Sequence, residues 1–177
     1  MSHPTGAAPV TAAAEAARRF LSRPGLPGTF GALMDEYARA AEDFCRTVEA
    51  LPAGGLDWAQ PSNDPDTQSV RAMCAHACGA ARGYANAIRR ARGLACEERS
   101  ALEPAAITAP AEVRHRLTDA LRYTEGAVEG LYEVDEPTYS AIKFQVRWGP
   151  TYDPEMLIEH AIVHLLRHRR QLERWPR

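Results

Sequence analysis

The sequence lacks the segments that would place it in a membrane or send it out of the cell. No run approaches the length of about 18 apolar residues that a membrane-spanning helix needs. The stretch MSHPTGAAPVTAAAEAARRF at the start has no basic end followed by an apolar core, so it does not resemble a secretory signal. The chain has four cysteines, which without such a signal are expected to be reduced thiols. These absences predict a cytoplasmic protein with no membrane partner.

The chain also lacks an excess of charge of either sign. It has 21 Lys and Arg against 23 Asp and Glu, a net charge of −2, and an isoelectric point near 6.3. A general surface for nucleic acid is therefore not expected. Five arginines do gather near the end of the chain, but cations at a helix C-terminus complement the helix dipole, which is the simpler explanation. They are Arg167, Arg169, Arg170, Arg174 and Arg177.

Most of the 177 residues have the three- and four-residue apolar spacing of amphipathic helices. The pattern predicts a first helix over 29–51 and a second that begins near Asp66 or Thr67, either of which could cap it, and runs to about Gly93. It predicts a third helix over 109–133. A fourth begins at the sequence DPEM, where Asp153 is the expected N-cap and Pro154 suits the first turn.

These helices predict an all-α protein with one domain. Residues 1–28, rich in Ala, Pro and Gly, are expected to form a flexible N-terminal tail whose middle could form a short helix. Residues 29–177 are expected to fold as an up-and-down four-helix bundle. The stretch EVDEPTYSAIKFQVRWGPTY, before the last helix, is predicted to be one long irregular crossover.

The last predicted helix carries histidines at 160, 164 and 168. His164 and His168 share its inward stripe with leucines and Trp175, whereas His160 lies at the edge of that stripe. A pair of histidines four residues apart on one face can pack in a core, or the two imidazoles can bind one ion. The pair alone leaves both interpretations open.

A third ligand would favour the metal, and His76 is the best candidate among the other histidines. It lies on the second predicted helix among small residues, which leave room for an imidazole to reach across a bundle. His3 lies in the tail, and His115 is turned to solvent by the helical repeat. Cys74 and Cys78 lie about 200° around the helix from His76, so they are expected to be buried packing residues.

The sequence therefore predicts a metal site formed by His76, His164 and His168. Three neutral imidazoles leave coordination positions open, as in catalytic metal sites. Nitrogen ligands suit Zn, Ni, Fe or Cu, and the sequence does not choose among them. A divalent ion in this setting would activate water or a thiol.

The segments SVRAMCAHACGA and HLLRHRRQLE, in this order, resemble the DinB/YfiT-like superfamily of four-helix-bundle metalloenzymes. In the motifs of that superfamily, His76 matches the histidine of helix two, and His164, His168, Arg169 and Gln171 match the H-x-x-x-H-R-x-Q element of helix four. The resemblance covers about residues 29–175. It implies one divalent metal ion, a small-molecule substrate and, as in thiol-dependent S-transferases of the superfamily, a low-molecular-weight thiol as cosubstrate. Arg170 departs from the pattern, which commonly has glycine there.

Together these features predict a metal-dependent hydrolase or thiol transferase. The alternative is a non-enzymatic metal-binding bundle, or a bundle in which the histidines only pack. A di-iron protein is rejected, because only Glu112 and His115 form the required Glu-x-x-His element. No acid or base is assigned, although three residues on the relevant helices are considered, namely Glu36, Tyr37 and Glu159.

A homodimer is also expected, because bundles of the superfamily often pair and because a single bundle is not expected to cover all the aromatic residues of its first and fourth helices. These residues are Tyr37, Phe44 and Trp175.

Overall fold

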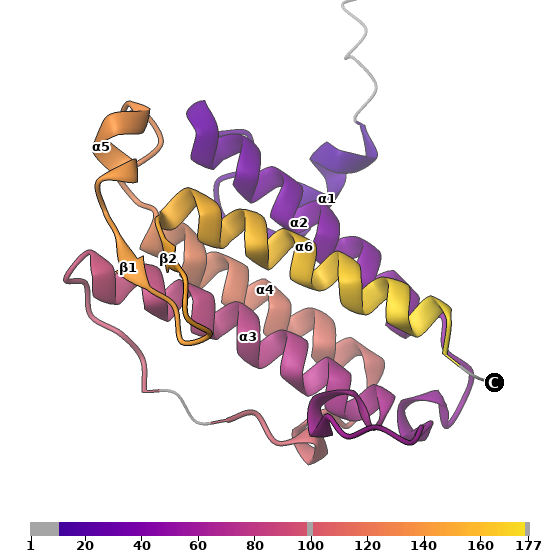
Figure 1. The fold of residues 1–177 in the computed structure, drawn as a ribbon. Coiled ribbons are helices and arrows are strands. Elements are labelled where there is room, and N and C mark those ends of the chain that lie inside the picture. The colour runs from indigo at the N-terminus through magenta and orange to yellow at the C-terminus, as the bar shows by residue number, and fades with distance from the viewer. Residues whose placement is uncertain (1–10, 99–100, 176–177) are drawn as a thin grey trace, which may run out of the picture.

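The computed structural model describes residues 11–98 and 101–175 and is mostly helical, so the all-α class is confirmed. Figure 1 shows long helices packed side by side, with a short hairpin at one edge. The helices are α1 (Ala12–Phe20), α2 (Gly28–Glu49), α3 (Val70–Ala91), α4 (Pro110–Ala127), α5 (Glu136–Ser140) and α6 (Pro154–Glu173). The strands are β1 (Phe144–Gln145) and β2 (Thr151–Tyr152), and three single-turn 3-10 helices occupy Gly55–Asp57, Pro65–Thr67 and Pro104–Ala106.

The four long helices contact one another in a closed ring. Helix α2 packs against α4 and α6, and α3 packs against the same two helices (Figure 1). Apolar residues at the three- and four-residue helical spacing are buried in this core, including Phe44 of α2, Leu117 of α4 and Leu165 of α6, each 1% exposed or less. No helix in the described part of the chain is long and apolar enough to cross a bilayer.

Two helix starts show where the capping signals were interpreted correctly and where they were not. Asp153 caps α6 by accepting a hydrogen bond from the Met156 amide at 3.0 Å, as predicted. The cap of α3 is neither Asp66 nor Thr67 but Ser69, whose hydroxyl accepts from Ala72 at 3.0 Å. Asp66 and Thr67 belong instead to a separate 3-10 turn, Pro65–Thr67, which the Asp64 side chain caps.

The third long helix is shorter than predicted. It ends at Ala127 rather than 133, and Gly130 follows with φ of 78°. Glycine adopts this left-handed conformation without the steric cost that other residues meet, so it suits the end of a helix. The apolar residues beyond the end, Val128 and Leu131, are still buried, which explains why the periodicity seemed to continue.

The segment predicted to be a tail contains a packed helix. The short helix expected there is α1, which contacts α2 and α4 and buries Phe20 completely. Directly after α1, the Glu125 carboxylate accepts hydrogen bonds from the amides of Ser22 and Arg23, both at 2.8 Å. Packing thus begins before residue 29, where the sequence placed the start of the domain; residues 1–10 lie outside the described part.

The crossover before α6 is more regular than expected. It contains helix α5 and an antiparallel hairpin in which Phe144 pairs with Tyr152. The turn of this hairpin carries Trp148, whose ring lies 6.0 Å from that of Tyr84 in α3 and 4.8 Å from that of His160 in α6. The hairpin therefore closes one side of the space between these two helices.

The cysteines behave as the helical repeat predicted. Cys74 and Cys78 are at most 4% exposed, and burial raises the pKa of Cys74 to about 12.

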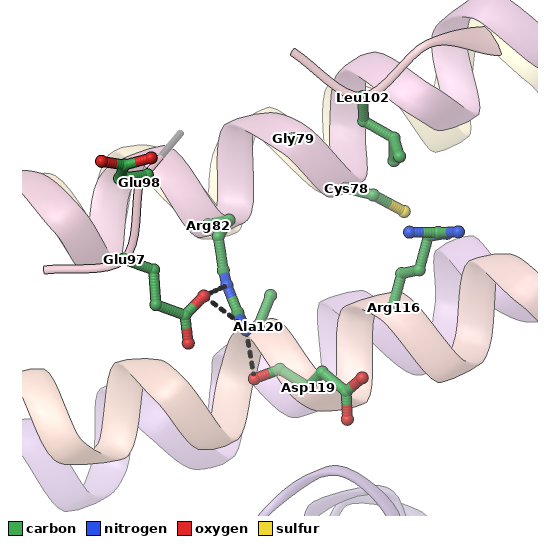
Figure 2. A pocket seen from close by; sticks show the side chains of 9 residues that line it. All are labelled: Cys78, Gly79, Arg82, Glu97, Glu98, Leu102, Arg116, Asp119 and Ala120. Carbon is green, nitrogen blue, oxygen red and sulfur yellow. Dashed lines mark hydrogen bonds and ion pairs between the residues drawn. The ribbon is translucent and has the colours of Figure 1, made fainter. Parts of the chain in front are cut away.

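Cys78 borders a small cavity of about 230 Å³ beside α3 and α4 (Figure 2). There Arg82 pairs with Glu97 and donates to the Asp119 carbonyl at 3.1 Å, so the main charges beside this cavity are already compensated within the chain.

Candidate metal centre

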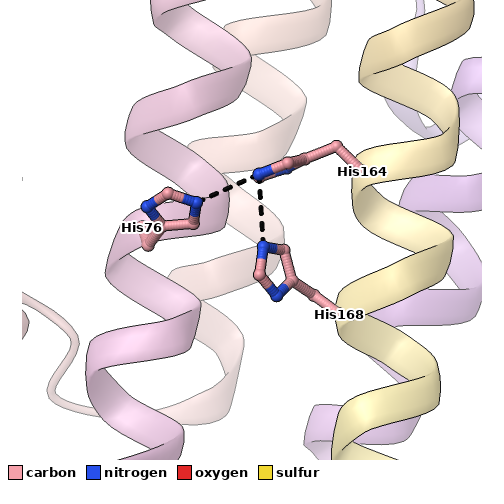
Figure 3. Close-up of side chains that lie close together, drawn as sticks. All are labelled: His76, His164 and His168. Carbon is pink, nitrogen blue, oxygen red and sulfur yellow. Dashed lines mark hydrogen bonds between the residues drawn. The ribbon is translucent and has the colours of Figure 1, made fainter. Parts of the chain in front are cut away.

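The structure brings together the three histidines that the sequence singled out. His76 lies in the second turn of α3, and His164 and His168 lie one turn apart on α6, which packs against it (Figure 3). The Nε2 atom of His164 is 3.0 Å from Nε2 of His76 and 3.2 Å from Nε2 of His168. One nitrogen from each ring lies within 4.8 Å of the other two, so this group could hold a metal ion.

The other ring nitrogens of the outer two histidines are held by oxygen atoms. His76 Nδ1 lies 2.8 Å from Asp66 Oδ2, and His168 Nδ1 donates to Gln171 Oε1 at 2.7 Å. A neutral imidazole whose proton is on Nδ1, facing such an oxygen, carries its lone pair on Nε2. Two lone pairs thus point at His164, which has a single Nε2 proton at most. At least one lone pair is left without a donor, and a cation would satisfy it.

The surroundings keep the rings on α6 neutral. His168 is 1% exposed, and His164 is half-buried. Burial, followed by the nearby positive or potentially positive groups, lowers the pKa of His164 to about 2. Burial likewise lowers the pKa of His168 to about 4, against the opposing effect of its hydrogen bond to Gln171. Neutral imidazoles are the form that binds metals.

Two of the three separations between the nitrogens fit a first-row divalent ion. Metal–nitrogen bonds of about 2.0–2.1 Å and tetrahedral angles place neighbouring ligand nitrogens about 3.3 Å apart. The separations of His164 Nε2 from the other two rings, 3.0 and 3.2 Å, are close to that value, and all three nitrogens lie within 4.8 Å of one another. The group has no thiolate or carboxylate among its converging atoms, and nitrogen-only ligation suits Zn, Ni, Fe or Cu.

The other histidines do not join the group. His160 stacks on Trp148 with an angle of 24° between the rings, and burial lowers its pKa. The structure thus gives His160 a neighbour that the sequence could not assign. His115 is exposed, as predicted, and lies 3.5 Å from the Asp119 carboxylate. His3 lies outside the described residues.

A cavity of about 500 Å³ opens beside the three histidines, and all three line it. This volume lies within the range of small-molecule sites. Ala80 and Gly83 of α3 also line it, in agreement with the expectation that small residues near His76 leave room. Coordination positions left open by three protein ligands would therefore face a space large enough for a small molecule.

None of the three acid–base candidates lines this cavity. Glu36 pairs with Arg39 on the surface of α2, and Glu159 is exposed on α6. Tyr37 is 1% exposed, and burial raises the pKa of its hydroxyl strongly. These positions give no support to an acid–base role for any of them.

Sequence reasoning missed the groups that hold and surround the histidines. Asp66 was interpreted as a helix cap, because its contact with His76 crosses the turn before α3 and follows no helical spacing. Tyr84 and Trp148 were not singled out, since their contact joins α3 to the hairpin turn. Gln171 did have a signal, because it belongs to the H-x-x-x-H-R-x-Q element.

No protein-family model, no curated protein and no solved structure matches the chain. The resemblance to the DinB/YfiT-like superfamily accordingly stays a prediction based on the two sequence segments that carry it.

Proposed function

We propose that the chain is an up-and-down four-helix-bundle metalloenzyme of the DinB/YfiT-like kind. It binds one divalent metal ion through His76, His164 and His168 and acts as a hydrolase or thiol transferase on a small electrophile. The observation that carries the proposal is the convergence of three Nε2 atoms, two of them on rings whose Nδ1 atoms are held by oxygen acceptors. A divalent ion in this position supplies Lewis acidity, which lowers the pKa of water or a thiol at an open position and polarises a carbonyl.

The chain's own residues have separate roles in this proposal. The Asp66 carboxylate and the Gln171 amide fix the orientation of His76 and His168, so the Nε2 atoms stay directed at one point. The exposed guanidinium of Arg167 is among the groups that lower the pKa of His164, so it helps to keep that ring neutral. The cavity favours an enzyme over a purely structural bundle, because packed histidines would need no such space beside them.

One of the two reasons for expecting a homodimer, that a single bundle leaves aromatic residues uncovered, does not hold. Tyr37, Phe44 and Trp175 are each 5% exposed or less within a single chain, so they do not need a partner to cover them. The pairing common in the superfamily is the reason that remains.

The first test is elemental analysis of the purified protein, followed by assays with low-molecular-weight thiols. Glutathione and cysteine are suitable thiols, with 1-chloro-2,4-dinitrobenzene as the transfer acceptor and 4-nitrophenyl acetate as the hydrolysis substrate. We expect about one equivalent of a divalent metal, activity that chelation abolishes, and recovery when the metal is restored. The His164→Ala variant should behave as the chelated protein does. Equal rates from the metal-loaded and metal-stripped protein would contradict the proposal.

A further inference from the structure

The cavity beside the histidines is positively charged, although the protein as a whole is not. Its lining contains Arg90, Arg147 and Arg167 and one carboxylate, Asp64, so three positive charges and one negative charge leave +2. The whole chain has a net charge of −2. A positive cavity in a slightly acidic protein concentrates anions locally.

These three arginines have no partners of their own in the described part of the chain. No ion pair or side-chain hydrogen bond joins their guanidinium groups to residues 11–98 or 101–175. The two arginines of the smaller cavity differ, because Arg82 is paired with Glu97 (Figure 2) and Arg116 with Glu112. The guanidinium donors around the larger cavity are therefore available to a ligand.

The middle of the cavity has flat aromatic surfaces. Trp148 meets Tyr84 at an angle of 78° and stacks on His160 at 24°. On the side of α3, the small residues Ala80, Gly83 and Ala87 leave depth between these rings and the helix. A planar ring can pack against such surfaces with its face or its edge.

The cavity is also long. His76 and Arg90 both line it and are 14 residues apart on α3, which corresponds to about 21 Å along the helix axis. A compact ion would fill only one end. A ligand that contacts the histidines, the rings and the distant arginines must be extended.

We propose that the cavity binds an extended small-molecule carboxylate with an aromatic body, and that its charge is recognised by Arg90, Arg147 and Arg167. This inference rests on the proposed function in one respect, because it places the reacting end of the molecule at the three-histidine group. The aromatic body lies against Tyr84 and Trp148, and the arginines provide the preference for an anion.

Calorimetric titration with three matched probes tests the inference. The probes are trans-cinnamate, which is flat and anionic; cinnamamide, which is flat and neutral; and 3-cyclohexylpropionate, which is anionic but not flat. We expect metal-loaded protein to bind cinnamate more tightly than either other probe, by about tenfold. Trp148→Ala should remove the preference for cinnamate over 3-cyclohexylpropionate.

The arginines are tested by substitution to glutamine. Since these side chains are exposed and the single carboxylate of cinnamate cannot contact all three, we expect each single change to weaken cinnamate binding by no more than about threefold, and the triple variant to weaken it more than any single change. The matched control is the triple variant Arg122→Gln, Arg170→Gln, Arg174→Gln, which removes the same charge from exposed positions that do not line the cavity. This control should bind cinnamate as the parent does.

The outcomes separate the inference from the proposed function. Equal cinnamate affinity in the parent and the cavity triple variant would overturn the inference, whatever the metal content. Equal losses in the cavity and control variants would also overturn it, because total charge would then be the cause. A protein that holds no metal but binds cinnamate through these arginines would contradict the proposed function and retain the charged cavity.

Discussion

Two polar clusters lie between packed helices in this protein, and they differ in how they are satisfied. Between α2 and α4, the Glu42 carboxylate accepts from Arg114 at 2.5 Å and also pairs with Arg19 and Arg46, each at 3.1 Å. Arg114 also donates a hydrogen bond to the Glu49 carboxylate, which lowers the pKa of that carboxyl group. Between α3 and α6, the Nε2 atoms of the three histidines face one another without a charge partner among them.

The difference separates a structural polar cluster from a candidate functional one. Opposite charges within the chain complete the Glu42 cluster, so nothing needs to be added to it. The histidine cluster has oxygen atoms beside its outer nitrogens, its inner Nε2 atoms converge, and it borders a cavity. A buried polar group without its partner costs stability, so its presence points to something that binds.

The largest expected effect comes from removing a converging nitrogen. We expect His76→Ala, His164→Ala and His168→Ala each to weaken metal binding by orders of magnitude, because two imidazoles hold a divalent ion poorly against water. Titration calorimetry with Zn²⁺, together with elemental analysis, measures this loss.

The matched controls are His115→Ala and His160→Ala, which should keep one equivalent of metal because neither ring joins the converging group. Circular dichroism must first show that every variant is folded. A folded His76→Ala protein that binds Zn²⁺ as tightly as the parent would refute the three-histidine site.

The second prediction concerns the Glu42 cluster, and its effect is on the stability of the fold rather than on metal binding. Glu42→Gln leaves Arg114, Arg19 and Arg46 without their shared negative charge, so we expect unfolding to become easier by about 3 kcal/mol. Metal affinity should not change. Urea unfolding measures the loss.

Glu36→Gln is the control for that change, because it removes an exposed carboxylate paired with Arg39 on the same helix. Its cost should be below about 0.5 kcal/mol. If both variants lost the same stability, the buried cluster would not have the structural role described.

The smallest of the three effects tests the oxygen that holds His76. We expect Asp66→Asn to weaken Zn²⁺ binding about tenfold, because the imidazole keeps a neutral acceptor but loses the carboxylate. Asp119→Asn provides a matched comparison, since Asp119 also lies beside a histidine Nδ1, at 3.5 Å on the surface. It should leave Zn²⁺ affinity unchanged, and a similar loss in both variants would exclude a specific role for Asp66.

Periodic features of the molecule could be predicted from the sequence. Helical spacing identified the long helices, placed His164 and His168 on the inward side of α6, and turned His115 to solvent. The N-cap at Asp153 was also correct, because a carboxylate before Pro154 is a local signal. These predictions depend on residues within a few positions of one another.

Features that depend on long-range contacts could not be predicted in this way. Asp66 reaches His76 from a separate turn, and Trp148 reaches His160 from a hairpin. No spacing within one helix encodes either contact. The packing of α1 was missed for the same reason, because its composition resembles a tail and its neighbours, α2 and α4, lie further along the chain.

The capping of Ser22 and Arg23 by Glu125 has a consequence for how the protein is made. The carboxylate that holds the end of α1 is separated from Ser22 by 103 residues. A ribosome adding about 5–20 residues per second needs roughly 5–20 s to cover that distance. During this interval α4, one of the two helices that α1 packs against, does not yet exist, so Phe20 and Leu21 cannot be fully buried. The nascent chain therefore exposes an apolar segment to chaperones until α4 has been synthesised.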